Sequence, residues 1–348
     1  MRRRAIVSFA VLGAVVAAGA GCGGGDNKAA STRKQRSSRA TSTIPADASL
    51  EQRIAIADRP RRGDFPAVRG RTLGDLAASV SASGQLGLAS STLLPRTERV
   101  AFGVLGPDKH FLYGPTALYV TSRSGAPAQG PFLAPADSTV ARAPFLSKTS
   151  AADTADIKAI YETQIPFRRP GRYGVLAVTK VASGRLVGAT GTLTVKRSSP
   201  IPDVGERPPR ISTDTVASAG GDLTKIDTRV PPDDMHKVNF KGVIGRRPVA
   251  LLFATPALCQ SRTCGPVTDL TLQVKSQYGK RMTFIHEEIY VKNNPDNGLR
   301  PQLHAFHLET EPWLFTFDRH GRVAARLEGS FGISAIRRAV QAALKPGA

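Results

Sequence analysis

Residues 249–254 read Val-Ala-Leu-Leu-Phe-Ala, an unbroken apolar run. A strand that is apolar at every position is buried on both faces, so its sheet needs a covering layer on each side. A loop with Cys259 and Cys264 follows the run, and residues 266–278 then show apolar side chains at helical spacing. This strand, loop and helix predict an α/β domain in the last third of the chain.

The segments after this unit alternate between strand and helix patterns. We expect strands at 282–290, 313–317 and 322–327, a short helix at 300–307, and a last helix capped by Ser334. The predicted order from residue 249 onward is therefore β-α-β-α-β-β-α.

This stretch, about residues 248–344, resembles thioredoxin-like oxidoreductases. The buried strand, the Cys264-Gly265-Pro266 turn, the Thr-Glu-Pro-Trp-Leu-Phe segment at 310–315 and the hairpin at 318–323 carry the resemblance. It implies a thioredoxin-like fold for residues 230–348, with Cys259 and Cys264 as a redox pair. It further implies a cis proline at Pro312, with Glu311 (through its backbone) and Trp313 contacting an extended substrate.

The cysteine loop departs from the family pattern. Four residues separate Cys259 from Cys264, where thioredoxins have two, so aligning from the strand or from the helix makes a different cysteine the attacking thiol. We favour Cys259 as the more exposed one, with Arg262 available to stabilise its thiolate. Leu252 stands in place of the usual buried acid, and Leu258 in place of the usual tryptophan.

Two other functions stay open. Copper chaperones of the Sco type share the fold and add a histidine to two cysteines, and the candidates for that ligand are His286, His304 and His307. Alternatively, the cysteines form a structural disulfide in a non-catalytic binding module.

The first 21 residues predict a signal peptide. Arg2, Arg3 and Arg4 precede a small and apolar run over residues 5–20, too short for a typical membrane span. Cys22 follows, and the junction resembles a bacterial lipoprotein lipobox, although Gly19 stands where the family usually has Leu. The resemblance implies lipidation of Cys22 and an anchor on the extracytoplasmic face of the cell membrane. An oxidising compartment would let the remaining two of three cysteines pair.

The formal net charge is +21, and much of the excess lies in the leader and in residues 28–71. We interpret residues 22–72 as a disordered basic linker near the membrane surface. The sequence shows no helix pattern typical of proteins that bind in a DNA groove and no basic stretch interleaved with aromatic residues. Nucleic acid is therefore not an expected partner. The expected partner is an exported protein, and neither an organic cofactor nor a metal is expected.

Residues 73–197 predict an all-β domain. Short apolar runs at 100–105, 117–121, 159–167, 173–179 and 187–195 are separated by Pro and Gly turns. The segment around Tyr173 resembles the tyrosine corner of immunoglobulin-like domains, which predicts an immunoglobulin-like sandwich. Residues 198–229, rich in proline and glycine, predict a hinge to the α/β domain. The predicted function is a membrane-anchored thiol–disulfide oxidoreductase acting on exported proteins.

Overall fold

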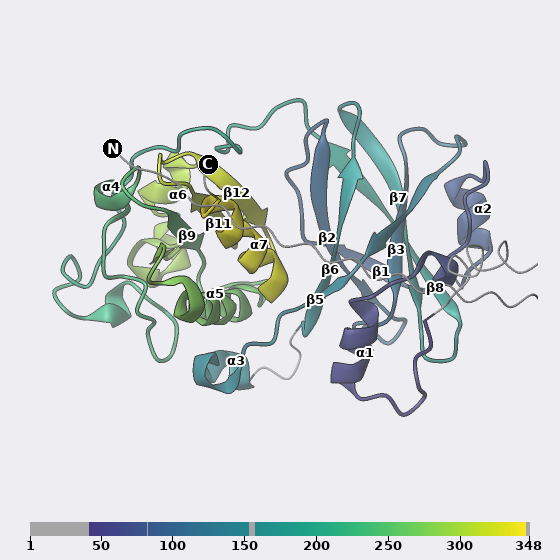
Figure 1. Ribbon diagram of the computed structural model, residues 1–348, viewed down its shortest axis with the longest axis horizontal. Helices are drawn as coiled ribbons and strands as arrows, with labels where there is room; N and C mark the ends of the chain where they lie inside the picture. Colours follow the sequence, from purple (N-terminus) through teal and green to yellow (C-terminus); the bar gives the residue numbers. More distant parts are fainter. Residues whose placement is uncertain (1–41, 82, 153–156, 346–348) are drawn as a thin grey trace, which may run out of the picture. The chain divides into compact units, whose positions relative to one another are not determined.

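The computed structural model describes residues 42–81, 83–152 and 157–345 (Figure 1). These residues belong to one compact unit. The predicted signal peptide, the lipidation site Cys22 and residues 23–41 of the predicted linker lie outside the described residues. No helix within the described ranges combines the length and the apolar character needed to cross a membrane.

The N-terminal part consists of two four-stranded antiparallel sheets, ordered β1-β2-β6-β5 and β4-β3-β7-β8. The strands span Gln85–Leu88 (β1), Thr97–Leu105 (β2), Thr116–Thr121 (β3), Gln129–Ala134 (β4), Ala136–Ser138 (β5), Ala159–Pro166 (β6), Gly171–Lys180 (β7) and Leu186–Val195 (β8).

Both sheets contribute to one apolar core, as expected of a sandwich. Phe102 and Tyr161 from the first sheet share this core with Leu118 and Val175 from the second. The five strands predicted from the sequence are confirmed as β2, β3, β6, β7 and β8. Strands β1, β4 and β5 were missed because they are short and lack a clear apolar alternation.

The prediction that residues 22–72 form a disordered linker is wrong for residues 42–72, which contain helical elements that pack on the sandwich. Helix α1 (Leu50–Ala57) starts with a capping box between Ser49 and Gln52, and Ala57 is buried in the sandwich core. The turn η1 (Arg62–Asp64) ends at a buried carboxylate that pairs with Lys180 of β7 at 3.1 Å. Helices α2 (Leu73–Ala78) and α3 (Lys148–Ala152) and the turn η2 (Ala143–Phe145) complete this part.

The C-terminal part contains a mixed four-stranded sheet in the order β10-β9-β11-β12. Strands β9 and β10 are parallel, and β11 is antiparallel to both β9 and β12. The elements are α4 (Phe240–Val243), β9 (Val249–Phe253), α5 (Cys264–Tyr278), β10 (Thr283–Glu287), α6 (Pro301–Ala305), β11 (Trp313–Phe317), β12 (Val323–Glu328) and α7 (Ile333–Ala343), with short turns at Leu223–Lys225 (η3), Val291–Asn293 (η4) and Pro295–Asn297 (η5). From β9 onward, the predicted order of strands and helices is confirmed.

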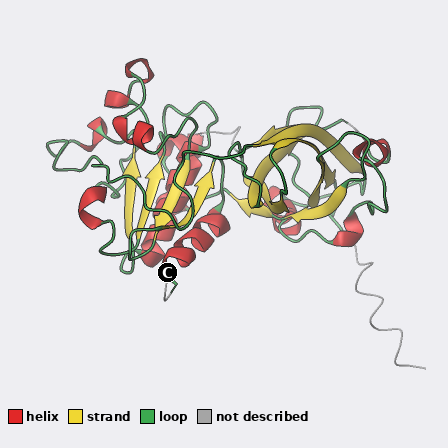
Figure 2. Cartoon of the chain, turned by 90° about the horizontal axis from the view of Figure 1, so that it is seen from above, coloured by secondary structure: helices red, strands yellow, loops and turns green. Residues whose placement is uncertain are grey.

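Helices cover both faces of this sheet, as the apolar run in β9 requires (Figure 2). Ala250 and Leu252 pack in the core beneath α5 and α7. The alternate residues of β9 pack on the other face with Phe240 of α4 and Phe306, which follows α6.

Residues 198–229 are not a free hinge. Ile201 and Ile211 are buried in the core on the α4 side of the C-terminal sheet. Gly205 and Glu206 exchange backbone hydrogen bonds with Val323 at 2.8 and 2.9 Å. The proline-rich segment therefore packs as part of the C-terminal fold, because its isoleucines supply apolar surface that the sequence pattern alone did not assign.

A carboxylate from strand β5 caps the last helix. Helix α7 begins after Gly332, and Asp137 accepts hydrogen bonds from the backbone N–H groups of Ser334 and Ala335 at 2.9 and 2.8 Å. Gly332 is required here, since a Cβ atom would lie 2.4 Å from Cγ of Asp137. The predicted cap at Ser334 is wrong, because a residue distant in sequence supplies the acceptor.

Candidate functional site

The two cysteines lie at the amino end of helix α5, in different environments. Cys264 is the first residue of the helix and is fully buried, whereas Cys259 lies in the preceding loop and is partly exposed. Both thiols are free. Because unpaired N–H groups and the helix dipole favour negative charge at this end, the position suits a thiolate.

The environment of Cys259 stabilises its thiolate. The Cys264 thiol is the main cause, through a hydrogen bond, and Ser261 and the backbone N–H groups of Cys264 and Thr263 add to it. Despite the opposing effect of burial, these groups lower the pKa of Cys259 to about 5. The exposed Arg262, which we predicted as the stabilising group, is not among these main causes.

Cys264 shows the opposite shift. Burial raises the pKa of the Cys264 thiol well above its ordinary value, and the neighbouring sulfur of Cys259 raises it further. At neutral pH the pair therefore combines one thiolate with one neutral thiol. The partly exposed sulfur is the thiolate.

Glu311 and Pro312 lie beside the sulfurs. The Glu311–Pro312 peptide bond is cis. The Glu311 carboxylate and both sulfurs lie within 4.8 Å of one another. Burial is the largest cause that raises the pKa of Glu311, to about 8, and the charge of Cys259 also contributes. The sequence predicted a role only for the backbone of Glu311. The structure adds its side chain to the group around the two sulfurs.

Trp313 does not present its side chain to this site. Its indole is 1 % exposed, stacks on Phe315 and donates a hydrogen bond from Nε1 to Thr310 Oγ1 at 3.1 Å. The indole is thus part of the core, and contact of Trp313 with substrate stays a prediction.

Two hollows adjoin the site. A cleft of about 520 Å³ is lined by Glu311 and Thr310 together with Ser261, Thr263 and residues of β1 and β8. A smaller hollow of about 210 Å³ is lined by Cys259, Arg262, Pro266 and residues of α3. Cys259 thus lines the smaller hollow, and Glu311 lines the larger one.

The histidines proposed as copper ligands lie elsewhere. His304 and His307 are exposed. His286 is buried. Its ring nitrogens contact Asp233 at 2.9 Å and the backbone oxygen of Ala254 at 3.0 Å, not the cysteine sulfurs. Among the described residues, the acidic side chain that lies close to both cysteine sulfurs is Glu311.

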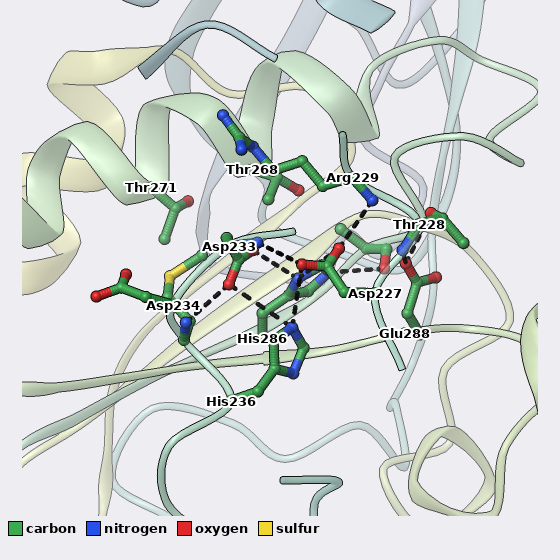
Figure 3. Close-up of polar contacts among 12 residues, drawn as sticks. Asp227, Thr228, Arg229, Asp233, Asp234, His236, Thr268, Thr271, His286 and Glu288 are labelled. Carbon is green, nitrogen blue, oxygen red and sulfur yellow. Dashed lines mark hydrogen bonds and ion pairs between the residues drawn. The ribbon is translucent and has the colours of Figure 1, made fainter. Parts of the chain in front are cut away.

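A second group of polar side chains lies in the C-terminal part, and we call it the Asp/His cluster (Figure 3). It consists of Asp227, Asp233, His236 and His286, all of them buried, with one potential ligand atom of each within 4.8 Å of the others. It was not predicted from the sequence, because Asp227 was assigned to the hinge and His286 was considered only as a copper ligand beside the two cysteines. The spacing Asp227-x5-Asp233-x2-His236 was the available signal.

Hydrogen bonds connect the Asp/His cluster to the cysteine loop. The imidazole of His286 contacts Ala254, which directly follows strand β9. The backbone N–H of Ala257 donates to Oγ1 of Thr228 at 3.1 Å, and the same hydroxyl donates to Glu288 at 2.7 Å. The segment that carries the cluster therefore also supports the loop that carries Cys259.

No family model matches the sequence. No curated protein matches it either. Among solved structures, the chain is similar to a protein described as the thiol:disulfide interchange protein DsbE from Chlorobium tepidum, with 15 % identity and a TM-score of 0.30. That similarity covers 41 % of this chain and 99 % of the other. We therefore infer the function from the geometry of the site.

Proposed function

We propose that this protein is a thioredoxin-like thiol–disulfide oxidoreductase acting on exported proteins. One observation carries the proposal, namely the asymmetry of the cysteine pair. Cys259 is partly exposed with its pKa lowered to about 5, and Cys264 is buried with its pKa raised. An exchange catalyst needs this division, because the thiolate attacks first and the protected thiol resolves the intermediate.

In the first step, the Cys259 thiolate attacks one sulfur of a substrate disulfide. The substrate S–S bond breaks, and a mixed disulfide between Cys259 and the substrate forms. The departing substrate thiolate takes the proton of the Glu311 carboxyl group, which is neutral near pH 7 because its pKa is about 8.

In the second step, Glu311 acts as the base. The negative charge of Cys259 is one cause of the raised pKa of Glu311. This charge is absent from the mixed disulfide, so the Glu311 carboxylate stays ionised. It takes the proton of Cys264 while that sulfur attacks Cys259. The mixed disulfide breaks, the second substrate thiolate leaves and is protonated by solvent, and the Cys259–Cys264 disulfide forms. The substrate has gained two electrons, and a dithiol donor restores the pair. Run in reverse, the same steps oxidise a dithiol substrate.

Substrate placement and location complete the proposal. We assign the backbone at Glu311 and Pro312 to holding an extended substrate segment, with the 520 Å³ cleft beside Glu311 available to it. Lipidation of Cys22 would place the catalyst on the extracytoplasmic face of the membrane. The all-β part is proposed to be immunoglobulin-like, supported by the hydroxyl of Tyr173, which donates to the backbone oxygen of Arg169 at 2.9 Å.

The reduction potential of the Cys259–Cys264 pair tests the function. The protein is equilibrated in glutathione or dithiothreitol buffers, and its thiols are counted by alkylation and mass. A midpoint of roughly −120 to −270 mV is expected, the range of exchange catalysts. A pair that stays oxidised below about −300 mV would instead be a structural disulfide, and the protein a binding module.

Substrate trapping provides the complementary test. The Cys264→Ser variant is expected to accumulate a mixed disulfide with a model disulfide peptide, because the resolving thiol is gone. The Cys259→Ser variant serves as the matched control and is expected to trap none. Equal trapping by both variants would contradict the assigned roles.

A further inference from the structure

We propose that the Asp/His cluster is a structural zinc site, with one nitrogen each from His236 and His286 and one oxygen each from Asp227 and Asp233. This site is separate from the cysteine pair and does not depend on the proposed redox function. Four protein ligands around one ion would leave no open position, which is the pattern of structural rather than catalytic zinc.

His236 gives the strongest indication. Its side chain is 1 % exposed, and neither ring nitrogen has a hydrogen-bond partner. An imidazole buried without a partner is costly. Its Nε2 lies 3.4 Å from Oδ2 of Asp227 and 3.6 Å from Oδ1 of Asp233. Two ligands of a tetrahedral zinc ion, with bonds of about 2.0–2.1 Å, lie about 3.3–3.4 Å apart. The separation from Asp227 matches this ligand–ligand distance, and the separation from Asp233 is slightly longer.

His286 is oriented as a metal ligand. Its Nε2 lies 3.0 Å from the backbone oxygen of Ala254, which can only accept, so the proton of the neutral ring belongs on Nε2. The lone pair on Nδ1 then points toward Oδ2 of Asp233 at 2.9 Å and Oδ1 of Asp227 at 3.9 Å. Zinc would take the place of the proton that an imidazolium ring would carry on Nδ1, and a histidine that donates its other N–H to a carbonyl is the usual outer-shell arrangement around zinc.

The carboxylates are fixed by the backbone. Asp227 accepts hydrogen bonds from the N–H groups of Arg229 at 2.8 Å and Asp233 at 2.6 Å. Asp233 accepts one from the N–H of Met235 at 2.8 Å. Each carboxylate keeps an acceptor lone pair for a metal, and these bonds hold both groups in place before an ion arrives.

The donor set selects the metal. Calcium and magnesium take six or more ligands that are all or mostly oxygen, and copper(I) favours sulfur, whereas two imidazoles with two carboxylates suit zinc. The nearby cation Arg229 is paired with Asp269 at 2.8 Å. A divalent ion would neutralise the two carboxylates of the cluster.

The site would tie together segments that are distant in sequence. Residues 227–236 have no helix or strand in the structure, yet they supply three of the four ligands, while His286 comes from β10. Zinc would therefore fasten this irregular segment to the sheet behind the cysteine loop. Because such a ligand set does not exist in an unfolded chain, zinc binding would couple to folding.

Zinc titration of the full-length chain tests the proposal. The Cys259→Ser/Cys264→Ser double variant is used as the background, so that thiolates cannot take the metal. After treatment with a chelator, zinc is added against a chromophoric competitor. The expected result is one zinc ion per chain, with affinity reduced at least tenfold by His236→Ala or Asp233→Asn. Replacing the exposed His304 with Ala is the matched control and should leave affinity unchanged.

The His236 variant is chosen because its ring makes no hydrogen bonds to lose. Near-ultraviolet circular dichroism checks its folding, and His236→Gln, which keeps more of the volume, replaces it if the Ala variant does not fold. Cobalt substitution gives a second readout. We expect strong visible absorption of tetrahedral cobalt without sulfur-to-metal charge transfer. This spectrum should be the same in the double variant and in the protein with its cysteines intact.

Three results would overturn the proposal. They are failure of the double variant to bind zinc, binding that His236→Ala and Asp233→Asn leave unchanged, and binding that requires the cysteines. The last result would place the metal at Cys259, Cys264 and Glu311 instead. The first two results leave disulfide exchange untouched, and exchange is measured separately by the reduction potential.

Discussion

The thiol of Cys264 donates a hydrogen bond to the sulfur of Cys259, and this contact shifts the two pKa values in opposite directions. The donor keeps its proton because it is buried at the start of α5. The acceptor becomes the thiolate because it collects that bond together with those from Ser261 and the backbone. The resulting difference in ionisation gives the two sulfurs different chemical roles.

The alkylation rate of Cys259 should follow its lowered pKa. Because the thiolate is the reactive form and is present above the pKa, carboxymethylation should be half-maximal near pH 5. Cys264→Ala removes the largest stabilising contact and should raise this midpoint by about one unit or more, while Ser261→Ala should raise it less. The pH dependence is measured by mass spectrometry. A wild-type midpoint near pH 8 would contradict the prediction.

Replacing Glu311 with Gln should slow resolution of the mixed disulfide. The amide cannot accept the proton of Cys264, and loss of a general base costs on the order of 100-fold in rate. Rapid-quench experiments with a disulfide peptide should show the mixed disulfide accumulating. The exposed Glu309, replaced with Gln, is the control. Equal resolution rates in wild type and Glu311→Gln would remove the carboxylate from the mechanism.

The buried pair of Arg229 and Asp269 should be important for stability. Asp269 also accepts two hydrogen bonds from Ser147, and Arg229 donates to the backbone oxygens of Phe145 and Pro231. Asp269→Ala leaves a buried cation unpaired and should lower the free energy of unfolding by about 3–5 kcal/mol in urea titrations. An Arg229→Met/Asp269→Leu double variant should recover part of this loss. No recovery would mean that the loss of stability comes from the lost hydrogen bonds of the pair and not from the unpaired buried charge of Arg229.

The cap provided by Asp137 should stabilise helix α7. Asp137→Ala removes the acceptor of two N–H groups and should cost about 1 kcal/mol, with faster hydrogen exchange at Ser334 and Ala335. The exposed Asp47, replaced with Ala, should have no such effect. Unchanged exchange at these two amides would show that the helix end does not depend on the carboxylate.

Local patterns were sufficient for many elements of the fold. The apolar run at 249–254 predicted β9, and residues 313–317 were predicted as the strand that forms β11. The cis bond that the family resemblance implied at Pro312 is also present. The two strand predictions succeeded because burial on both faces leaves its pattern in adjacent residues.

Other features depend on contacts between distant residues. The sequence placed residues 198–229 in a hinge, but Ile201 and Ile211 reach the core of the C-terminal sheet. It placed the cap of α7 at Ser334, whereas Asp137 supplies it from a strand about 200 residues earlier. No local pattern records which distant surface will cover an isoleucine or a free N–H group.

The sequence by itself determined the order of strands and helices in the C-terminal part and the position of the cysteines at the start of a helix. The tertiary structure alone decided which sulfur is the thiolate, that the Glu311 carboxylate lies beside it, and that Asp227, Asp233, His236 and His286 meet. The physical reason is that secondary structure follows from neighbours along the chain. A pKa or a ligand set depends instead on burial and on groups that only folding brings within a few ångströms.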